Sequence, residues 1–200
     1  RPEFSVFSIL PGLDLAFALE PFGLIFALIA AALWPLTTLY AAGYMRGNDE
    51  PNQTRFFICF ALAISAAIGM ALSANLLTLF VFYEMMTLVT YPLVTHHGDI
   101  EARNGGRVYI GILMTTSIGL FLPAIVITWL IAGNVDFTPG GVFAGTGLGG
   151  LAAMGLYSLF IYGVGKAAVM PMHRWLPAAM VAPTPVSALL HAVAVVKAGV

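Results

Sequence analysis

The most constraining feature of this 200-residue chain is the length of its uncharged apolar segments. Residues 22–45 carry no charge, and residues 56–96 carry only one, Glu84. A helix needs about 20 predominantly apolar residues to cross the hydrocarbon core of a bilayer. Charged residues make up only 8% of the chain, against about 25% in soluble domains. A soluble enzyme or binding module is therefore excluded, and we predict an integral protein of a lipid bilayer.

The same segments predict helices and not the strands of a membrane barrel. Barrel strands alternate apolar and polar residues, whereas these runs are continuous. As one helix, residues 56–96 would measure roughly 60 Å, about twice the hydrocarbon thickness. The run must therefore fold back, and residues 73–75 are the turn-like point near its middle.

The expected fold is an all-α polytopic membrane protein with about six transmembrane helices. Their expected ranges are 22–45, 56–73, 76–96, 108–131, 151–170 and 184–200, and together they form one transmembrane domain over residues 1–200. Arg1 is not an initiator residue, and the sixth helix is still running at Val200. We therefore expect the chain to be a piece of a longer polytopic protein.

The arginines predict the orientation of the chain. Those expected on one side of the membrane are Arg46, Arg55, Arg103, Arg107 and Arg174, and the other side has only Arg1. Basic residues are enriched in cytoplasmic loops. We therefore expect the segments near 46–55, 97–107 and 171–182 to be cytoplasmic, with the protein in the inner (plasma) membrane.

Three ionisable residues lie inside the predicted spans: Glu84, Lys166 and Lys197. A charge near the bilayer centre costs about 2.5–3.5 kcal/mol on insertion scales, and such residues usually face a bundle interior or a water path. Lysines normally lie near helix ends, where the ammonium reaches water. Because both lysines of the chain lie within spans, they are the strongest functional signal in the sequence.

Polar residues recur at helical spacing around these groups. They form three expected stripes: Glu84 with Thr87, Tyr91 and Thr95; Lys166 with Ser158 and Tyr162; and His191 with Thr184 and Ser187. Residues three, four or seven apart share one face of a helix. The pattern therefore predicts helices that enclose a polar seam, with Lys197 pointing away from the His191 stripe.

Pro171 predicts an interruption in the fifth span. Proline frees a backbone carbonyl one turn upstream, and inside a membrane that group needs water, a side chain or an ion. Interrupted helices that carry an ionisable residue form the midplane sites of many transporters. We therefore expect a discontinuous helix near Lys166–Pro171.

Structural roles are the alternatives to these readings. Glu84 and Lys166 can form a buried ion pair that only holds helices together, and His191 and the hydroxyl residues can serve as interhelical hydrogen-bond partners. A metal site is not expected. His173 and His191 match no zinc-ligand spacing, and the single cysteine, Cys59, excludes a Cys-based site.

Several motifs are familiar in combination. The longest runs from Gly165-Lys166-Ala167-Ala168 through Trp175-Leu176-Pro177 and Ala182-Pro183-Thr184-Pro185 to Val196-Lys197-Ala198-Gly199. Shorter ones are Asn75-Leu76-Leu77 before Tyr83-Glu84, and Tyr44-Met45-Arg46-Gly47. Together they resemble the antiporter-like, proton-translocating membrane subunits found in Mrp-type Na⁺/H⁺ antiporters, respiratory complex I and membrane-bound hydrogenases.

The resemblance implies most of one five-helix repeat within a subunit of about fourteen helices built from inverted repeats. It implies that Glu84 and Lys166 are a coupled carboxylate–lysine pair, that Lys197 is a central lysine and that His191 is a motif histidine. Ala178 and Ala179 stand where complex I members often have an acidic residue, and many of those members lack a lysine matching Lys197. These departures favour a protein like the D-type subunits of Mrp antiporters, or one of hydrogenase type.

The expected function is proton translocation within a multisubunit membrane complex, with Na⁺ as the second ion in the Mrp-type alternative. A proton-pumping subunit of complex I or of a membrane-bound hydrogenase is another alternative, and a non-transporting scaffold subunit is the rival of another class. The expected partners are other membrane subunits, with no cofactor and no catalytic residue. With 8 basic and 9 acidic residues and no basic segment, nucleic acid is excluded.

Overall fold

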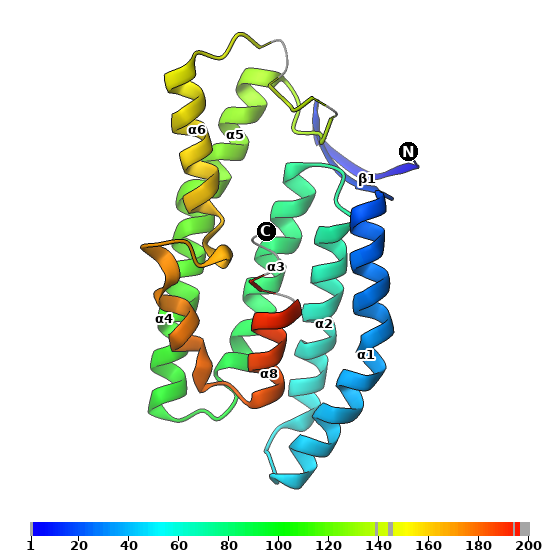
Figure 1. Cartoon of the computed structure of the whole chain (residues 1–200), viewed down its shortest axis with the longest axis vertical. Helices are drawn as coiled ribbons and strands as arrows, with labels where there is room; N and C mark the ends of the chain where they lie inside the picture. Colours follow the sequence, from blue (N-terminus) through cyan, green and yellow to red (C-terminus); the bar gives the residue numbers. More distant parts are fainter. Residues whose placement is uncertain (1, 139, 144–145, 194, 197–200) are drawn as a thin grey trace.

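A computed structural model describes residues 2–138, 140–143, 146–193 and 195–196 as a bundle of helices with a β-hairpin at one end (Figure 1). The helices are α1 (Pro21–Gly47), α2 (Gln53–Ala71), α3 (Leu76–Val94), α4 (Ile100–Thr116), α5 (Leu122–Ala132), α6 (Gly150–Gly163), α7 (Trp175–Ala178) and α8 (Thr184–Ala188). The π-helical turns are η1 (Ser117–Phe121) and η5 (Leu189–Val193), and the 3-10 turns are η2 (Gly165–Ala167), η3 (Met172–Arg174) and η4 (Ala179–Val181).

Among the described residues, four helices are long and apolar enough to cross a membrane: α1, α2, α3 and the continuous helix Ile100–Ala132 formed by α4, η1 and α5. They make the protein a multi-pass helical membrane protein. α6 is apolar but has only 14 residues.

The first three helices lie over the segments expected at 22–45, 56–73 and 76–96. The long apolar run folds back between Ala71 and Leu76, where a turn was expected. Asn75 starts α3 there, because its side-chain oxygen accepts a hydrogen bond from the Thr78 N–H at 2.8 Å.

The fourth helix begins earlier than the expected 108–131. It starts at Ile100, because the Asp99 carboxylate accepts a hydrogen bond from the Ala102 N–H at 2.7 Å. Glu101 in the first turn further favours this start. The residues before 108 are too polar to predict a membrane span, but they are compatible with a helix that extends beyond the hydrocarbon.

The last two segments differ from the expected 151–170 and 184–200. α6 ends at Gly163, so residues 164–170 do not continue the helix. After Thr184 the described residues form α8 and then η5. Lys197, expected near the middle of the last span, lies outside the described residues.

A β-hairpin precedes α1 and was not expected. Strand β1 (Glu3–Leu10) pairs antiparallel with β2 (Leu13–Ala18), with irregular register after Ser5 and Ser8. The apolar residues of this segment do not alternate regularly, so no strand pattern is evident in it. The hairpin is stabilised by the bundle instead: the Ala18 N–H donates to the Leu72 carbonyl at 2.9 Å.

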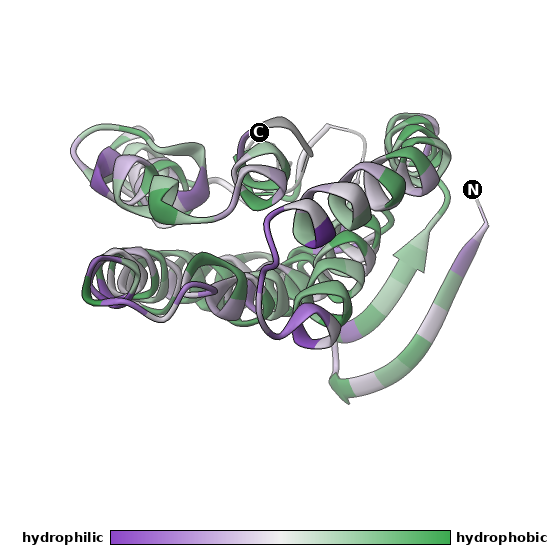
Figure 2. Ribbon diagram, turned by 90° about the horizontal axis from the view of Figure 1, so that it is seen from below, coloured by the Kyte–Doolittle hydropathy of each residue, from purple (hydrophilic) through white to green (hydrophobic). Residues whose placement is uncertain are grey.

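The connections gather at the two ends of the bundle. At one end the Arg55 guanidinium donates to the His96 carbonyl at 3.5 Å, which joins the α1–α2 turn to the α3–α4 turn. At the other end the Leu76 N–H donates to the Val135 carbonyl at 3.0 Å, beside the hairpin. Figure 2 views the molecule from the first end and shows hydrophilic residues at its turns.

Candidate functional site

The chain leaves helical geometry at the end of α6, where a short irregular segment replaces the expected continuation (Figure 1). A Cβ atom added to Gly163 would lie 2.6 Å from the backbone nitrogen of Phe121 in η1. Gly165 approaches the Thr116 hydroxyl comparably closely. A larger residue at either position would have to displace the neighbouring helix. Packing on the α4–α5 helix therefore accompanies the end of α6 before Lys166.

Lys166 turns into the bundle at this break and is 0% exposed. Its Nζ donates a hydrogen bond to the backbone carbonyl of Tyr83 and lies 3.5 Å from the centroid of the Tyr83 ring. The Lys166 N–H donates to the Tyr83 hydroxyl at 3.0 Å, and the Trp175 indole N–H donates to the Gly165 carbonyl at 2.9 Å. Two side chains thus hold the backbone of the break, and Tyr83 also holds the ammonium.

Glu84 follows Tyr83 on α3, and both of its carboxylate oxygens are shielded from solvent. Within the part of the chain that the structure describes, neither oxygen has a hydrogen-bond partner. The Lys166 ammonium therefore contacts the residue beside Glu84 and makes no hydrogen bond to the carboxylate. A buried carboxylate without a partner is costly, and such groups are candidates for proton uptake.

Thr87 is the member of the expected Glu84 stripe that the structure brings to Lys166. Its hydroxyl donates to the same Tyr83 carbonyl at 3.2 Å. Tyr91, from the same stripe, is partly buried against the core. Thr90 was not part of the stripe, yet its hydroxyl lies 2.6 Å from that of Tyr109, and both are buried.

The expected stripe of Ser158, Tyr162 and Lys166 is wrong. Ser158 and Tyr162 lie on an exposed face of α6, and the Ser158 hydroxyl donates to the Met154 carbonyl of its own helix at 2.8 Å. The stripe assumed a continuous helix to residue 170. Because α6 ends at Gly163, Lys166 turns inward while the two hydroxyl residues stay outside.

The remaining expected residues lie at separate places. The Ser187 hydroxyl donates to the Ala182 carbonyl at 3.3 Å. The His191 Nε2 lies 2.8 Å from the Met180 sulfur. Pro171 is exposed on the segment between η2 and η3, within the interruption expected there.

Tyr83 and Trp175 are the site residues that the spacing argument missed. Stripes were built from residues three or four positions from Glu84, and Tyr83 is adjacent to it, so it points about 100° away on the helix. A usable signal was present nonetheless. A hydroxyl-bearing ring beside the one charge of an apolar run needs a hydrogen-bond partner when buried.

A second ionisable cluster lies at the end of the bundle that holds the α3–α4 turn. The His96 ring is buried, 3.7 Å from a Glu50 oxygen, and the other Glu50 oxygen lies 3.3 Å from the His97 ring. Burial lowers the pKa of His96, although the Glu50 carboxylate opposes this effect and Arg55 adds to it.

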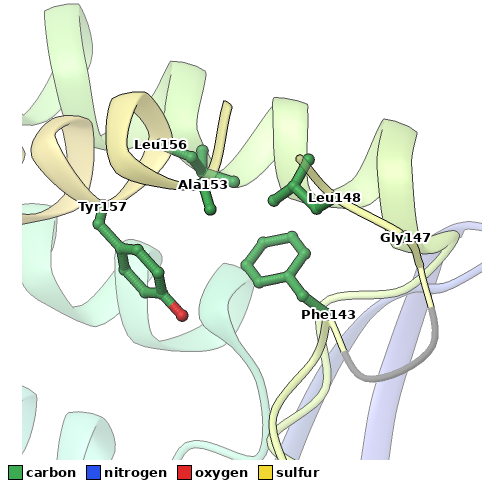
Figure 3. Close-up of a pocket in the computed structure, with 6 residues that line it drawn as sticks. All are labelled: Phe143, Gly147, Leu148, Ala153, Leu156 and Tyr157. Carbon is green, nitrogen blue, oxygen red and sulfur yellow. The ribbon is translucent and has the colours of Figure 1, made fainter. Parts of the chain in front are cut away.

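A cavity of about 280 Å³ lies beside the first half of α6 (Figure 3). Its lining residues are Phe143, Gly147, Leu148, Ala153, Leu156 and Tyr157. The Tyr157 hydroxyl is the polar side-chain group of this set. The cavity therefore lacks the ionisable groups found around Lys166.

Comparison with known proteins gives a family for this arrangement. Residues 73–200, more than half of the chain, match the family model described as NADH:quinone oxidoreductase/Mrp antiporter, transmembrane. In fold the chain matches the Mrp complex from Dietzia sp. DQ12-45-1b with a TM-score of 0.84 at 23% identity, covering 99% of this chain and 22% of that one. A membrane-bound sulfane sulfur reductase, an archaeal respiratory membrane complex, matches with a TM-score of 0.77 at 24% identity, covering 94% and 38%.

The curated relatives are of two kinds. A probable K⁺/H⁺ antiporter protein of the A/B type from Rhizobium meliloti (strain 1021) is 33% identical, covering 94% of this chain and 19% of the relative. Chain 5 of an NAD(P)H-quinone oxidoreductase of Synechocystis sp. is 30% identical, covering 94% and 28%. The chain thus spans less than a third of the length of these relatives. The resemblance inferred from the motifs is confirmed, and the chain belongs to the NADH:quinone oxidoreductase/Mrp antiporter transmembrane family.

Proposed function

We propose that this chain is the part of a membrane subunit in which protons are handed to and from Lys166 during translocation. The observation that carries the proposal is the fully buried Lys166 at a helix break, one residue away on α3 from a shielded and unpartnered carboxylate. A lysine can release and rebind a proton, whereas an arginine in a protein stays charged. Lys166 therefore serves as the proton-exchanging group and Glu84 as the carboxylate that biases it.

The geometry favours exchange over a fixed ion pair. A carboxylate that approaches an ammonium stabilises the charged form, and one that withdraws removes that stabilisation. In a permanent staple the two groups would satisfy each other, because an unpaired buried charge is expensive. Here the Lys166 ammonium bonds to a neutral carbonyl, and neither Glu84 oxygen has a hydrogen-bond partner among the described residues.

The wider route is part of the same proposal. From Lys166 the proton passes by His191 and water toward Lys197, and onward through helices of the longer subunit. Other membrane subunits are the partners, as the multisubunit Mrp and respiratory complexes of the relatives suggest. We place the protein in the plasma membrane with the segments near 46–55, 97–107 and 171–182 on the cytoplasmic side. An Mrp-type antiporter that exchanges protons for Na⁺ is the parent complex we favour, and a complex I-type or hydrogenase-type complex is the alternative.

The decisive experiment uses the full-length subunit in its complex, reconstituted into vesicles. Lys166→Arg and Glu84→Gln should assemble in normal amounts yet lose transport to background, because the first cannot release a proton and the second cannot carry charge. Ser158→Ala is the matched control and should transport normally, since Ser158 lies on the outer face of α6.

A scaffold role predicts a different pattern. If assembled Lys166→Arg and Glu84→Gln complexes transport at the wild-type rate, the polar groups only hold helices together and the proposed function is wrong.

A further inference from the structure

Tyr83 contacts Lys166 through three different groups. Its hydroxyl accepts the Lys166 N–H at 3.0 Å, its carbonyl accepts from Nζ, and its ring face lies 3.5 Å below Nζ. Both side chains are fully buried. Tyr83 is therefore the principal partner of the buried lysine among the described residues.

The hydroxyl contact positions the backbone of the break. Because α6 ends at Gly163, the Lys166 N–H lacks the regular partner of an α-helix, and a buried N–H without a partner is destabilising. The Tyr83 hydroxyl supplies that partner from α3. It thereby links the break to the helix that carries Glu84.

The ring and the carbonyl position the ammonium. A cation over an aromatic face is stabilised by up to about 2 kcal/mol when water is excluded. Neither group carries a net charge, so both can hold the ammonium without neutralising it as a carboxylate would. The Phe121 ring packs edge-on against Tyr83, with centroids 5.5 Å apart, and limits movement of the ring.

We propose that Tyr83 is a positioning residue for proton exchange, which holds the Lys166 ammonium in a neutral cradle beside Glu84. Lys166 then has two alternative partners on adjacent residues of one helix. In one state it lies on Tyr83, as observed, and in the other it pairs with the Glu84 carboxylate. This inference rests on the proposed function of Lys166 and adds the residue that holds the unpaired state.

Two replacements at position 83 separate the contributions in the reconstituted full-length complex. Tyr83→Phe keeps the ring and the carbonyl but removes the hydroxyl, and the transport rate should fall about fivefold with an unchanged pH profile. A trifluorinated phenylalanine at the same position keeps the shape but withdraws electrons from the ring face. The pH of half-maximal transport should then lie about one unit lower than in Tyr83→Phe, because a weaker cradle needs more protons to load Lys166.

The same two replacements at Tyr109 are the matched control. Tyr109 is equally buried, but its hydroxyl pairs with Thr90 and its ring faces Trp175. Neither replacement there should move the pH profile. A merely structural tyrosine would reduce the amount of assembled complex without shifting the profile at either position.

Lys166→Ala separates the two hypotheses. If the assembled Lys166→Ala complex transports like the wild type, the proposed function itself fails. If that variant is inactive, while Tyr83→Phe transports at the wild-type rate and fluorination leaves the pH profile in place, Lys166 keeps its role and the positioning role of Tyr83 is wrong.

Discussion

His96 and His97 are adjacent in the chain but differ in burial, and this difference separates their chemistry. The His96 side chain is 0% exposed and that of His97 is 38% exposed, and both face Glu50. Burial disfavours the charged imidazolium of His96, which lowers its pKa below the ordinary 6.5. His96 is therefore held neutral in the folded protein at pH values where an unfolded chain would protonate it.

This residue makes stability depend on pH in a defined direction. As the pH falls through about 6.5, the unfolded state takes up a proton on His96 before the folded state does, so stability decreases. The loss is at most about 1.4 kcal/mol per pH unit and levels off below the folded pKa. In thermal unfolding of the detergent-solubilised protein between pH 7.5 and 5.5, His96→Gln should flatten this dependence. His97→Gln is the control and should retain the wild-type slope; equal slopes in wild type and His96→Gln would refute the prediction.

At the scale of elements, the end of α6 is set by contact with another helix. Gly163→Ala should destabilise the protein by about 1–3 kcal/mol, because the added Cβ would lie 2.6 Å from the Phe121 nitrogen and neither backbone can yield cheaply. Gly155→Ala on the same helix is the control, since nothing lies within 4 Å of its added Cβ. Thermal unfolding of both variants measures the difference. A Gly163→Ala protein as stable as Gly155→Ala would show that this contact does not restrict α6.

The same contact explains how much of the fold the sequence could predict. The long helices and the fold-back between α2 and α3 follow from continuous apolar runs and a bilayer of fixed thickness. The end of α6 does not, because residues 164–170 are apolar enough to continue a helix and are diverted by packing on η1. The site was therefore predicted only in part: Lys166 and Glu84 stand out by charge alone, whereas Tyr83 becomes a partner only after the break turns Lys166 inward.

At the scale of the whole molecule, the α4–α5 helix joins the two ends of the bundle without interruption over Ile100–Ala132. Cysteines at Arg103 and Gly147, both exposed, should therefore react with an impermeant thiol reagent from opposite sides of the membrane. Arg103 should react from the cytoplasmic side. The test needs a Cys59→Ser background, because Cys59 is the native thiol. Labelling of both positions from one side would overturn this topology.

The depth of Tyr83 on α3 has an electrical consequence. Tyr83 is seven residues from the first residue of α3 and eleven from the last, so Lys166 is held roughly 10 Å from one end of that helix and roughly 16 Å from the other. A membrane voltage acts on any charge within its field, by about 2.3 kcal/mol per elementary charge for each 100 mV crossed. A proton that reaches Lys166 from the arginine-rich end crosses more than half of α3 before it binds. Its binding therefore does work against, or gains energy from, the voltage, and the occupancy of Lys166 responds to membrane potential as well as to pH.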